Sequence, residues 1–163
     1  MIESNICFDP IIDKDSRILI LGSFPGVKSL EEQQYYAHPR NQFWKILFTL
    51  LNEDFSENYQ DRIHLVQKHK IALWDVINTC DRKGSLDSAI ENEERNDLLK
   101  LLEQNPQIKS IYCNGKKAYE SLLKLVGFNF NIPINALPST SPAHAALSFQ
   151  GKLEQWSSIK KYL

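Results

Sequence analysis

The stretch Arg17-Ile-Leu-Ile-Leu-Gly-Ser-Phe-Pro-Gly26 decides the fold. Its four consecutive apolar residues, Ile18 to Leu21, are typical of a strand that is buried on both faces of a parallel sheet. Gly22 and Gly26 then allow the chain to turn sharply and to approach another molecule closely. The stretch therefore predicts a buried strand that runs directly into a loop suited to binding.

The segment Tyr35-Tyr-Ala-His-Pro-Arg-Asn-Gln-Phe-Trp44 predicts a helix that begins beside this loop. Pro39 favours the first turn of a helix and keeps the preceding residue out of it, so we expect a helix over residues 39–52. Arg40, Asn41 and Phe43 then lie at its start, where unpaired N–H groups also favour an anion. A strand end, a glycine loop and a helix start with an amide, a cation and aromatic rings together predict a ligand pocket.

The rest of the chain alternates short apolar runs with amphipathic segments. The apolar runs predict three further strands, at residues 71–77, 108–113 and 132–137. The amphipathic segments predict four further helices, at residues 56–70, 93–104 and 116–126 and from about Ser148 onward. We expect Ser56 and Asn92 to cap the first two of these helices, and residues 78–85 to form a polar segment. This alternation predicts an α/β fold with a four-stranded parallel sheet covered on both faces, in one domain over residues 1–163.

In such a sheet, ligands bind beyond the carboxyl ends of the strands. Four loops converge there by this prediction, and they carry polar side chains: Asn41, Asp75, Asn114, Ser139, Thr140, Ser141 and His144. Each of these residues alone fits an ordinary structural role, such as a turn or a helix cap. Their predicted meeting at one edge of the sheet indicates a site.

Composition places the chain among ordinary globular proteins. It has 163 residues, 42% hydrophobic and 24% charged, with no run long enough to cross a membrane and no signal peptide, so we expect a cytoplasmic protein. The net charge is −1, from 19 basic and 20 acidic residues, so any DNA binding requires a local basic face. Three scattered cysteines and four histidines without paired spacing favour neither a disulfide framework nor a metal site.

Several familiar chemistries are not supported. The chain lacks G-x-x-x-x-G-K-[ST] and G-x-G-x-x-G, which argues against a phosphate-binding nucleotide loop, and it lacks the G-x-S-x-G nucleophile elbow. No lysine stands in an apolar setting that would suit a Schiff base. What remains is a set of neutral polar groups at strand ends, and we expect no cofactor.

Five motifs resemble the uracil-DNA glycosylase superfamily, and most closely its hypoxanthine-DNA (deoxyinosine) glycosylase branch, family 6. The motifs are Gly22-Ser-Phe-Pro-Gly-Val-Lys-Ser-Leu30, Tyr35-Tyr-Ala-His-Pro-Arg-Asn-Gln-Phe-Trp44, Ala72-Leu-Trp-Asp-Val76, Tyr112-Cys-Asn-Gly-Lys116 and Leu137-Pro-Ser-Thr-Ser-Pro-Ala143. The resemblance covers residues 17–150. It implies a three-layer α/β/α sandwich on a four-stranded parallel sheet, in agreement with the strands above.

The resemblance also implies residue roles. Asn41 is the expected principal catalytic residue, assisted by Asn114, and Phe43 is expected to stack on an extruded base. Contacts to the base are expected from Gly22, Ser23, Phe24, Phe43 and Asp75. Contacts to DNA are expected from Arg40, Lys116, Ser139, Thr140, Ser141 and His144.

Two departures from the superfamily pattern bear on mechanism. Many members carry Asp or Asn in the first loop to position water, whereas this loop reads Ser-Phe-Pro-Gly, so Asn41 is the best candidate for that role. The second loop begins Leu137-Pro-Ser in place of His-Pro-Ser, so an imidazole is missing there.

The expected activity is hydrolysis of the N-glycosidic bond of a deaminated base, hypoxanthine foremost, in double-stranded DNA. Neutral donors suffice to stabilise the departing base, and an amide matches the N–H and carbonyl that hypoxanthine and uracil share. The alternatives are a uracil or mismatch glycosylase, an inactive module that binds damaged DNA, and a small-molecule nucleoside hydrolase. We expect a monomer, with no membrane partner.

Overall fold

A four-stranded parallel sheet forms the centre of the protein. The computed structural model describes residues 5–127 and 130–163. The strands lie in the order β3-β2-β6-β7. Their bounds are Ile18–Gly22 for β2, Ile71–Asp75 for β3, Ser110–Asn114 for β6 and Ile134–Leu137 for β7. The four strands predicted from the apolar runs are confirmed, each within a few residues of its predicted bounds.

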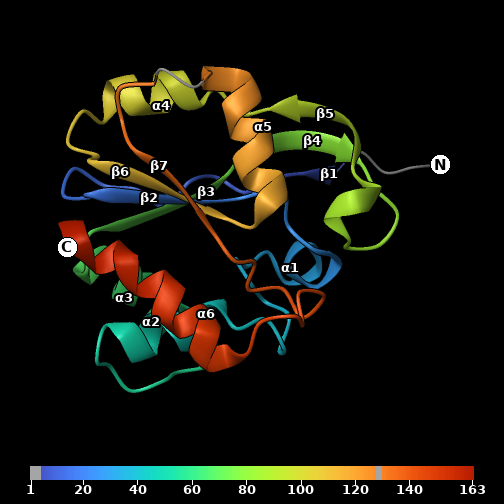
Figure 1. The fold of residues 1–163 in the computed structure, drawn as a ribbon. Helices are drawn as coiled ribbons and strands as arrows, with labels where there is room; N and C mark the ends of the chain where they lie inside the picture. Colours follow the sequence, from blue (N-terminus) through green and yellow to red (C-terminus); the bar gives the residue numbers. More distant parts are fainter. Residues whose placement is uncertain (1–4, 128–129) are drawn as a thin grey trace.

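Helices cover both faces of this sheet, which confirms the three-layer arrangement (Figure 1). One face carries α4 (Leu98–Gln104) and α5 (Lys116–Val126), and the other carries α2 (Phe43–Leu50), α3 (Tyr59–Lys68) and α6 (Phe149–Trp156). The side chains of strand β2 pack against the helices of both layers, because successive side chains of a strand point to opposite faces of the sheet.

The two hydrophobic cores follow from this alternation. Ile18 and Ile20 pack in the core beneath α2, α3 and α6, whereas Leu19 and Leu21 pack in the core beneath α4 and α5. All four side chains are fully buried. Burial on both faces accounts for the uninterrupted apolar run that the sequence displays.

A second, antiparallel sheet was not predicted. It has the order β1-β4-β5, with β1 at Asn5–Ile6, β4 at Ile77–Asp81 and β5 at Glu91–Arg95. The predicted strand 71–77 ends at Asp75, and the chain enters β4 after Val76, whose N–H donates to the Gly22 carbonyl at 2.8 Å. The predicted polar segment 78–85 is therefore partly a strand.

The helix predicted over 93–104 is confirmed only from Leu98 to Gln104, and the prediction of Asn92 as its cap is wrong. Residues Glu91–Arg95 form β5, and α4 begins at Leu98 with Asp97 as its cap, whose carboxylate accepts from the Lys100 N–H at 3.1 Å. Asn92 has a φ of 52° within the strand. The polar residues of β5 pair with β4 at the protein surface, so no apolar pattern marked the strand.

Two other helix starts also differ from the prediction. Helix α2 begins at Phe43, because residues 39–42 form a turn in which the Asn41 N–H donates to the His38 carbonyl at 2.9 Å. Helix α3 is capped by Asn58, which accepts from the Asp61 N–H, and not by Ser56. The helix over 116–126 and the last helix, capped by Ser148, are confirmed.

The remaining elements are short. Helix α1 (Val27–Glu32) follows the glycine loop, and 3₁₀ helices span Asp87–Ala89 and Ser157–Tyr162. Among the helices of the described residues, none combines the length and apolar character needed to cross a membrane.

Candidate active site

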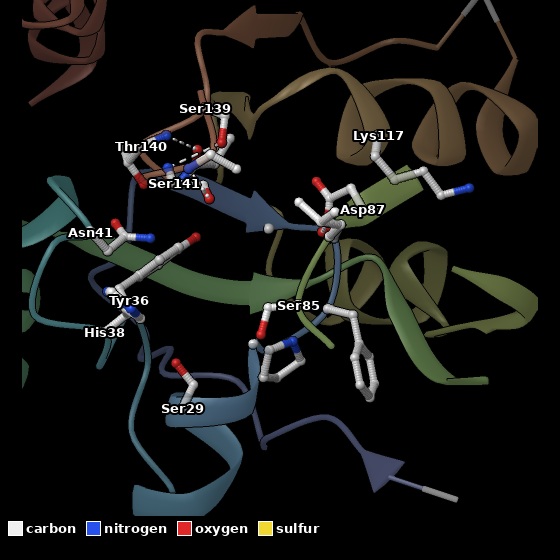
Figure 2. A pocket seen from close by; sticks show the side chains of 18 of the residues that line it. Ser29, Tyr36, His38, Asn41, Ser85, Asp87, Lys117, Ser139, Thr140 and Ser141 are labelled. Carbon is white, nitrogen blue, oxygen red and sulfur yellow. Dashed lines mark hydrogen bonds between the residues drawn. The ribbon is translucent and has the colours of Figure 1, made fainter. Parts of the chain in front are cut away.

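A cavity of about 550 Å³ lies at the carboxyl edge of the parallel sheet (Figure 2). Its wall combines the carboxyl ends of β2, β3 and β6 with the loops that follow β2 and β7, residues 85–88 after β4 and the segment between α1 and α2. The strand ends therefore meet at the edge where the topology of the sheet places them.

Three strand ends form a row along this edge. Gly22 of β2 is the register partner of Asp75 of β3, and Asn114 of β6 follows Cys113, the partner of Leu21. A Cβ added to Gly22 would lie 2.6 Å from Asp75 Oδ1 and 3.1 Å from the Tyr36 hydroxyl. Only glycine at this position lets the carboxyl and the phenol come this close to the strand end.

Asp75 is a buried carboxyl that lines the cavity. Its side chain is 4% exposed, and Oδ2 has no hydrogen-bond partner among the described residues. The pKa of Asp75 is raised to about 7, chiefly by burial and also by the nearby Asp87 carboxylate, while the Arg82 guanidinium opposes this rise. The proton on this carboxyl is therefore exchangeable near neutral pH, which is uncommon for aspartate.

Asn114 is locked to the loop that follows β7. Its amide nitrogen donates to Thr140 Oγ1 at 3.0 Å, and its amide oxygen accepts from the Thr140 N–H at 3.0 Å. An asparagine amide carries two N–H donors and two acceptor lone pairs, so one lone pair remains, and the second N–H lies beside the Tyr36 hydroxyl, whose pKa is raised by burial and lowered by a hydrogen bond from Asn114. Thr140 thus orients Asn114 and fixes the loop at the same time.

Of the stacked rings of Tyr36 and Phe43, Tyr36 lines the cavity and Phe43 does not. The two rings stack with centroids 3.8 Å apart and 25° between their planes, and Phe43 is fully buried behind Tyr36. Phe43 also makes edge contacts with Trp44 and Trp156 in the core. The expectation that Phe43 stacks on the base is therefore not met, because as the first residue of α2 it faces the core.

Asn41 enters the cavity from the turn before α2. Its amide oxygen accepts from the Phe43 N–H at 3.0 Å, which leaves the amide nitrogen as the group that faces the cavity (Figure 2). The turn is tightened by His38 Nδ1, which accepts from the Arg40 N–H at 3.1 Å. Asn41, Tyr36 and His38 line the same cavity as Asn114 and Asp75.

The first loop is held by polar groups of the segment after β4. The Ser23 hydroxyl donates to Asp87 Oδ1 at 2.6 Å, and the Val27 N–H donates to Ser85 Oγ at 2.9 Å. Arg82 donates to the Pro25 carbonyl and lies 5.3 Å from the centre of the Phe24 ring. Ser23 and Phe24 both line the cavity as expected, but the Ser23 hydroxyl is already committed to Asp87.

The loop after β7 is anchored by α6. Trp156 Nε1 donates to the Pro138 carbonyl at 2.9 Å, and the buried Lys152 Nζ donates to the His144 carbonyl at 2.8 Å. The Gln42 N–H also donates to the Thr140 carbonyl at 3.0 Å. These contacts hold the loop at both ends and in the middle before any ligand binds.

The remaining expected DNA contacts lie around the mouth of the cavity, with one exception. Ser139, Ser141, His144 and Lys116 contribute to the lining, and Lys116 and His144 are exposed. Arg40 is exposed but lines a neighbouring hollow.

Tyr36 was not anticipated at the site, whereas Lys117 was expected near the loop ends among the residues of a basic face. Tyr36 and Lys117 both line the cavity, and Lys117 Nζ pairs with Glu93 Oε1 at 2.5 Å. Tyr36 directly precedes Ala-His-Pro-Arg-Asn, so its place next to this motif could have indicated a residue of the site. Its backbone has a φ of 53°, a left-handed conformation that no sequence pattern indicates. Within the described ranges, no three His, Cys, Asp or Glu side chains are grouped to hold a metal ion.

Comparison with known proteins connects this geometry to a family. The family model of the Uracil DNA glycosylase superfamily matches residues 10–160. A hypoxanthine DNA glycosylase of Methanosarcina barkeri is 41% identical over 132 residues, which are 79% of this chain and 84% of that protein. A hypoxanthine DNA glycosylase of Methanosarcina acetivorans is 35% identical over 158 residues, which are 95% of this chain and 97% of that protein.

A solved structure agrees. The solution NMR structure of a Methanosarcina acetivorans protein assigned as a uracil DNA glycosylase superposes with a TM-score of 0.77 at 36% identity, and the match covers 93% of each chain. The chain belongs to the uracil DNA glycosylase superfamily.

Proposed function

We propose that this protein is a monofunctional DNA glycosylase that hydrolyses the N-glycosidic bond of deaminated bases in DNA, with hypoxanthine as its main target. The observation that carries the proposal is the meeting of Asn41, Asn114 and Tyr36 around one cavity at the carboxyl edge of the sheet. The names of the two Methanosarcina relatives support the choice of hypoxanthine. The product is an abasic site, whose further processing belongs to base excision repair.

Asn114 is the proposed reader of the base. Its remaining lone pair and its second N–H match N1–H and O6 of hypoxanthine, whereas adenine presents the reverse pattern. Because Thr140 fixes the amide, the side chain cannot turn over to suit adenine. Each polar group left unpaired in such a buried pocket costs about 1–3 kcal/mol, so adenine is rejected.

Asn41 is the proposed catalytic amide. As the glycosidic bond breaks, positive charge develops on the sugar and negative charge on the base, and fixed donors stabilise the departing base. The first loop reads Ser-Phe-Pro-Gly and carries no Asp or Asn, and its Ser23 hydroxyl donates to Asp87, so it offers no free side-chain group to hold water. The amide nitrogen of Asn41 is then the group available to bind the attacking water or the base.

We propose that Tyr36 and the loop after β7 bind the DNA. A base must leave the helical stack to enter the cavity, and it would rest on the Tyr36 ring, which Phe43 supports from behind. Ser139, Ser141, His144 and Lys116 at the mouth, with Arg40 beside it, are placed to contact phosphate and add affinity without sequence preference.

The test is release of hypoxanthine from a duplex that contains one deoxyinosine. Wild-type protein should produce alkali-labile strand breaks at that position, and Asn41→Ala should slow release by at least a hundredfold. Asn131→Ala, which removes an exposed amide outside the cavity, is the matched control and should cleave at the wild-type rate. A panel with uracil, xanthine and free inosine would separate this proposal from a uracil glycosylase and from a nucleoside hydrolase.

One observation favours a second candidate, an inactive module that binds damaged DNA. The first loop lacks the Asp or Asn that many superfamily members carry, and its serine is bound to Asp87. This candidate predicts tight binding to a deoxyinosine duplex with no base release. The free amide nitrogen of Asn41 in the cavity argues for the enzyme.

A further inference from the structure

The carboxyl of Asp75 is a buried titratable group that lines the cavity and that the proposed function leaves without a task. It lines the cavity, it is 4% exposed, and Oδ2 has no hydrogen-bond partner in the described part of the chain. An unpaired polar atom at this depth destabilises the fold, because it has lost its contacts with water and gained none in return. A group kept under these conditions at a strand end of the cavity is a candidate for a role in catalysis.

The surroundings of Asp75 favour its protonated form. The titratable and charged groups packed around it come from the N-terminal arm, the segment after α1, the end of β4 and the 3₁₀ helix: Cys7, Tyr35, Tyr36, Arg82 and Asp87. Arg82 donates to the Pro25 carbonyl, and the described residues contain no ion pair to Asp75. The effects of burial and of the Asp87 carboxylate therefore outweigh that of the Arg82 guanidinium, and the pKa of Asp75 rises to about 7.

The position of Asp75 sets it across the cavity from the base-reading amide. Asp75 ends β3 and Asn114 ends β6, with Gly22 of β2 between them. Adjacent strands lie about 4.8 Å apart, so the two backbones are separated by about 10 Å. Asp75 Oδ1 and the Tyr36 hydroxyl lie over Gly22 in this interval, so a base that Asn114 reads enters the cavity that the Asp75 carboxyl lines.

We propose that Asp75 is the general acid of the reaction, and that it protonates a ring nitrogen of the departing purine. The inference rests on the proposed function. In the step, the Asp75 proton moves to N3 or N7, the bond from C1′ to N9 breaks with its electron pair remaining on N9, and the base leaves as neutral hypoxanthine. Water then adds to C1′ and gives up a proton, which restores the acid on Asp75 directly or through solvent.

This role gives the site a means to favour a purine over uracil. Asn114 alone cannot separate the two bases, because both present an N–H beside a carbonyl. Hypoxanthine has two ring nitrogens with free lone pairs besides the glycosidic one, and uracil has none. A proton donor opposite Asn114 therefore accelerates release of hypoxanthine and does not accelerate release of uracil by the same route.

The test is the pH dependence of single-turnover hypoxanthine release. For wild-type protein the rate should be constant below pH 6 and fall about tenfold per pH unit above pH 8. Asp75→Asn, which keeps the shape but has no acidic proton, should release hypoxanthine at least a hundredfold more slowly at pH 6, with no such fall at higher pH. Binding of Asp75→Asn to a duplex with 2′-fluoro-deoxyinosine, which resists cleavage, should remain within a few-fold of wild type.

A second variant tests the assignment if Asp75→Asn fails to fold. Asp87→Asn removes a neighbouring negative charge, so the falling limb of the wild-type profile should move to lower pH. A merely structural Asp75 would leave the limb in place.

The outcomes separate the two proposals. If wild-type protein releases no hypoxanthine, the proposed function fails. If wild-type protein releases hypoxanthine at a rate that is flat from pH 6 to pH 9, or if Asp75→Asn keeps the wild-type rate and profile, the proposed function stands and the role of Asp75 is overturned.

Discussion

Replacing Asp75 with asparagine should stabilise the protein at alkaline pH while it impairs catalysis. The carboxyl is buried without a hydrogen-bond partner for Oδ2 in the described residues, and its pKa rises from an ordinary 3.8 to about 7. Between these two values the folded protein holds a proton that the unfolded chain has released. The free energy of unfolding therefore falls as pH rises through this window, and the loss is complete above pH 7.

The size of the effect follows from the two pKa values. A difference of about three pH units, at about 1.36 kcal/mol each, amounts to about 4 kcal/mol that wild-type protein loses between pH 4 and pH 8. About two of these units lie between pH 5 and pH 7, which corresponds to about 2.7 kcal/mol. Asparagine carries no titrating proton, so the Asp75→Asn variant escapes this loss.

The assay is urea denaturation of both proteins at pH 5 and pH 8. The free energy of unfolding of Asp75→Asn, relative to wild type, should increase by about 2.7 kcal/mol from the lower to the higher pH. Asp54→Asn, which alters an exposed carboxyl, is the control for general effects of charge. An unchanged difference between variant and wild type across this range would refute the assignment of a buried, neutral Asp75.

Four further substitutions probe the site. Gly22→Ala places a Cβ 2.6 Å from Asp75 Oδ1, so we expect a loss of about 1–3 kcal/mol in urea denaturation together with slower base release. Tyr36→Leu should weaken binding to a deoxyinosine duplex by about 1–3 kcal/mol in a titration, whereas Phe43→Leu should chiefly lower the melting temperature. Lys152→Met releases the His144 carbonyl from α6, and we expect about tenfold weaker duplex binding by fluorescence anisotropy with a melting temperature close to wild type.

The central sheet was predictable because its strands are buried on both faces. Ile18 to Leu21 supply two cores at once, so they had to be uniformly apolar, and few structures besides a buried parallel strand require a short run of this kind. The antiparallel sheet gave no such signal. Glu91–Arg95 pairs with β4 at the surface, and its five polar residues fit an exposed helix as well as a strand.

The site was predictable as a set of strand ends, and less so in its details. Asn114 and Asp75 follow from strand order alone, because the carboxyl ends of parallel strands meet at one edge. That Tyr36 lines the cavity in place of Phe43 depends on the left-handed backbone conformation of Tyr36 and on the residue at which α2 begins. The spacing of residues in the sequence predicts neither the φ of Tyr36 nor the start of that helix four residues after Pro39.

The most direct test of the central claim is base release from a deoxyinosine duplex under single-turnover conditions, with wild-type protein and Asn41→Ala side by side. We expect wild-type protein to release free hypoxanthine and leave an abasic site, and Asn41→Ala to bind the same duplex with release slowed by at least a hundredfold. Equal rates for the two proteins, or no release by wild type, would contradict the account.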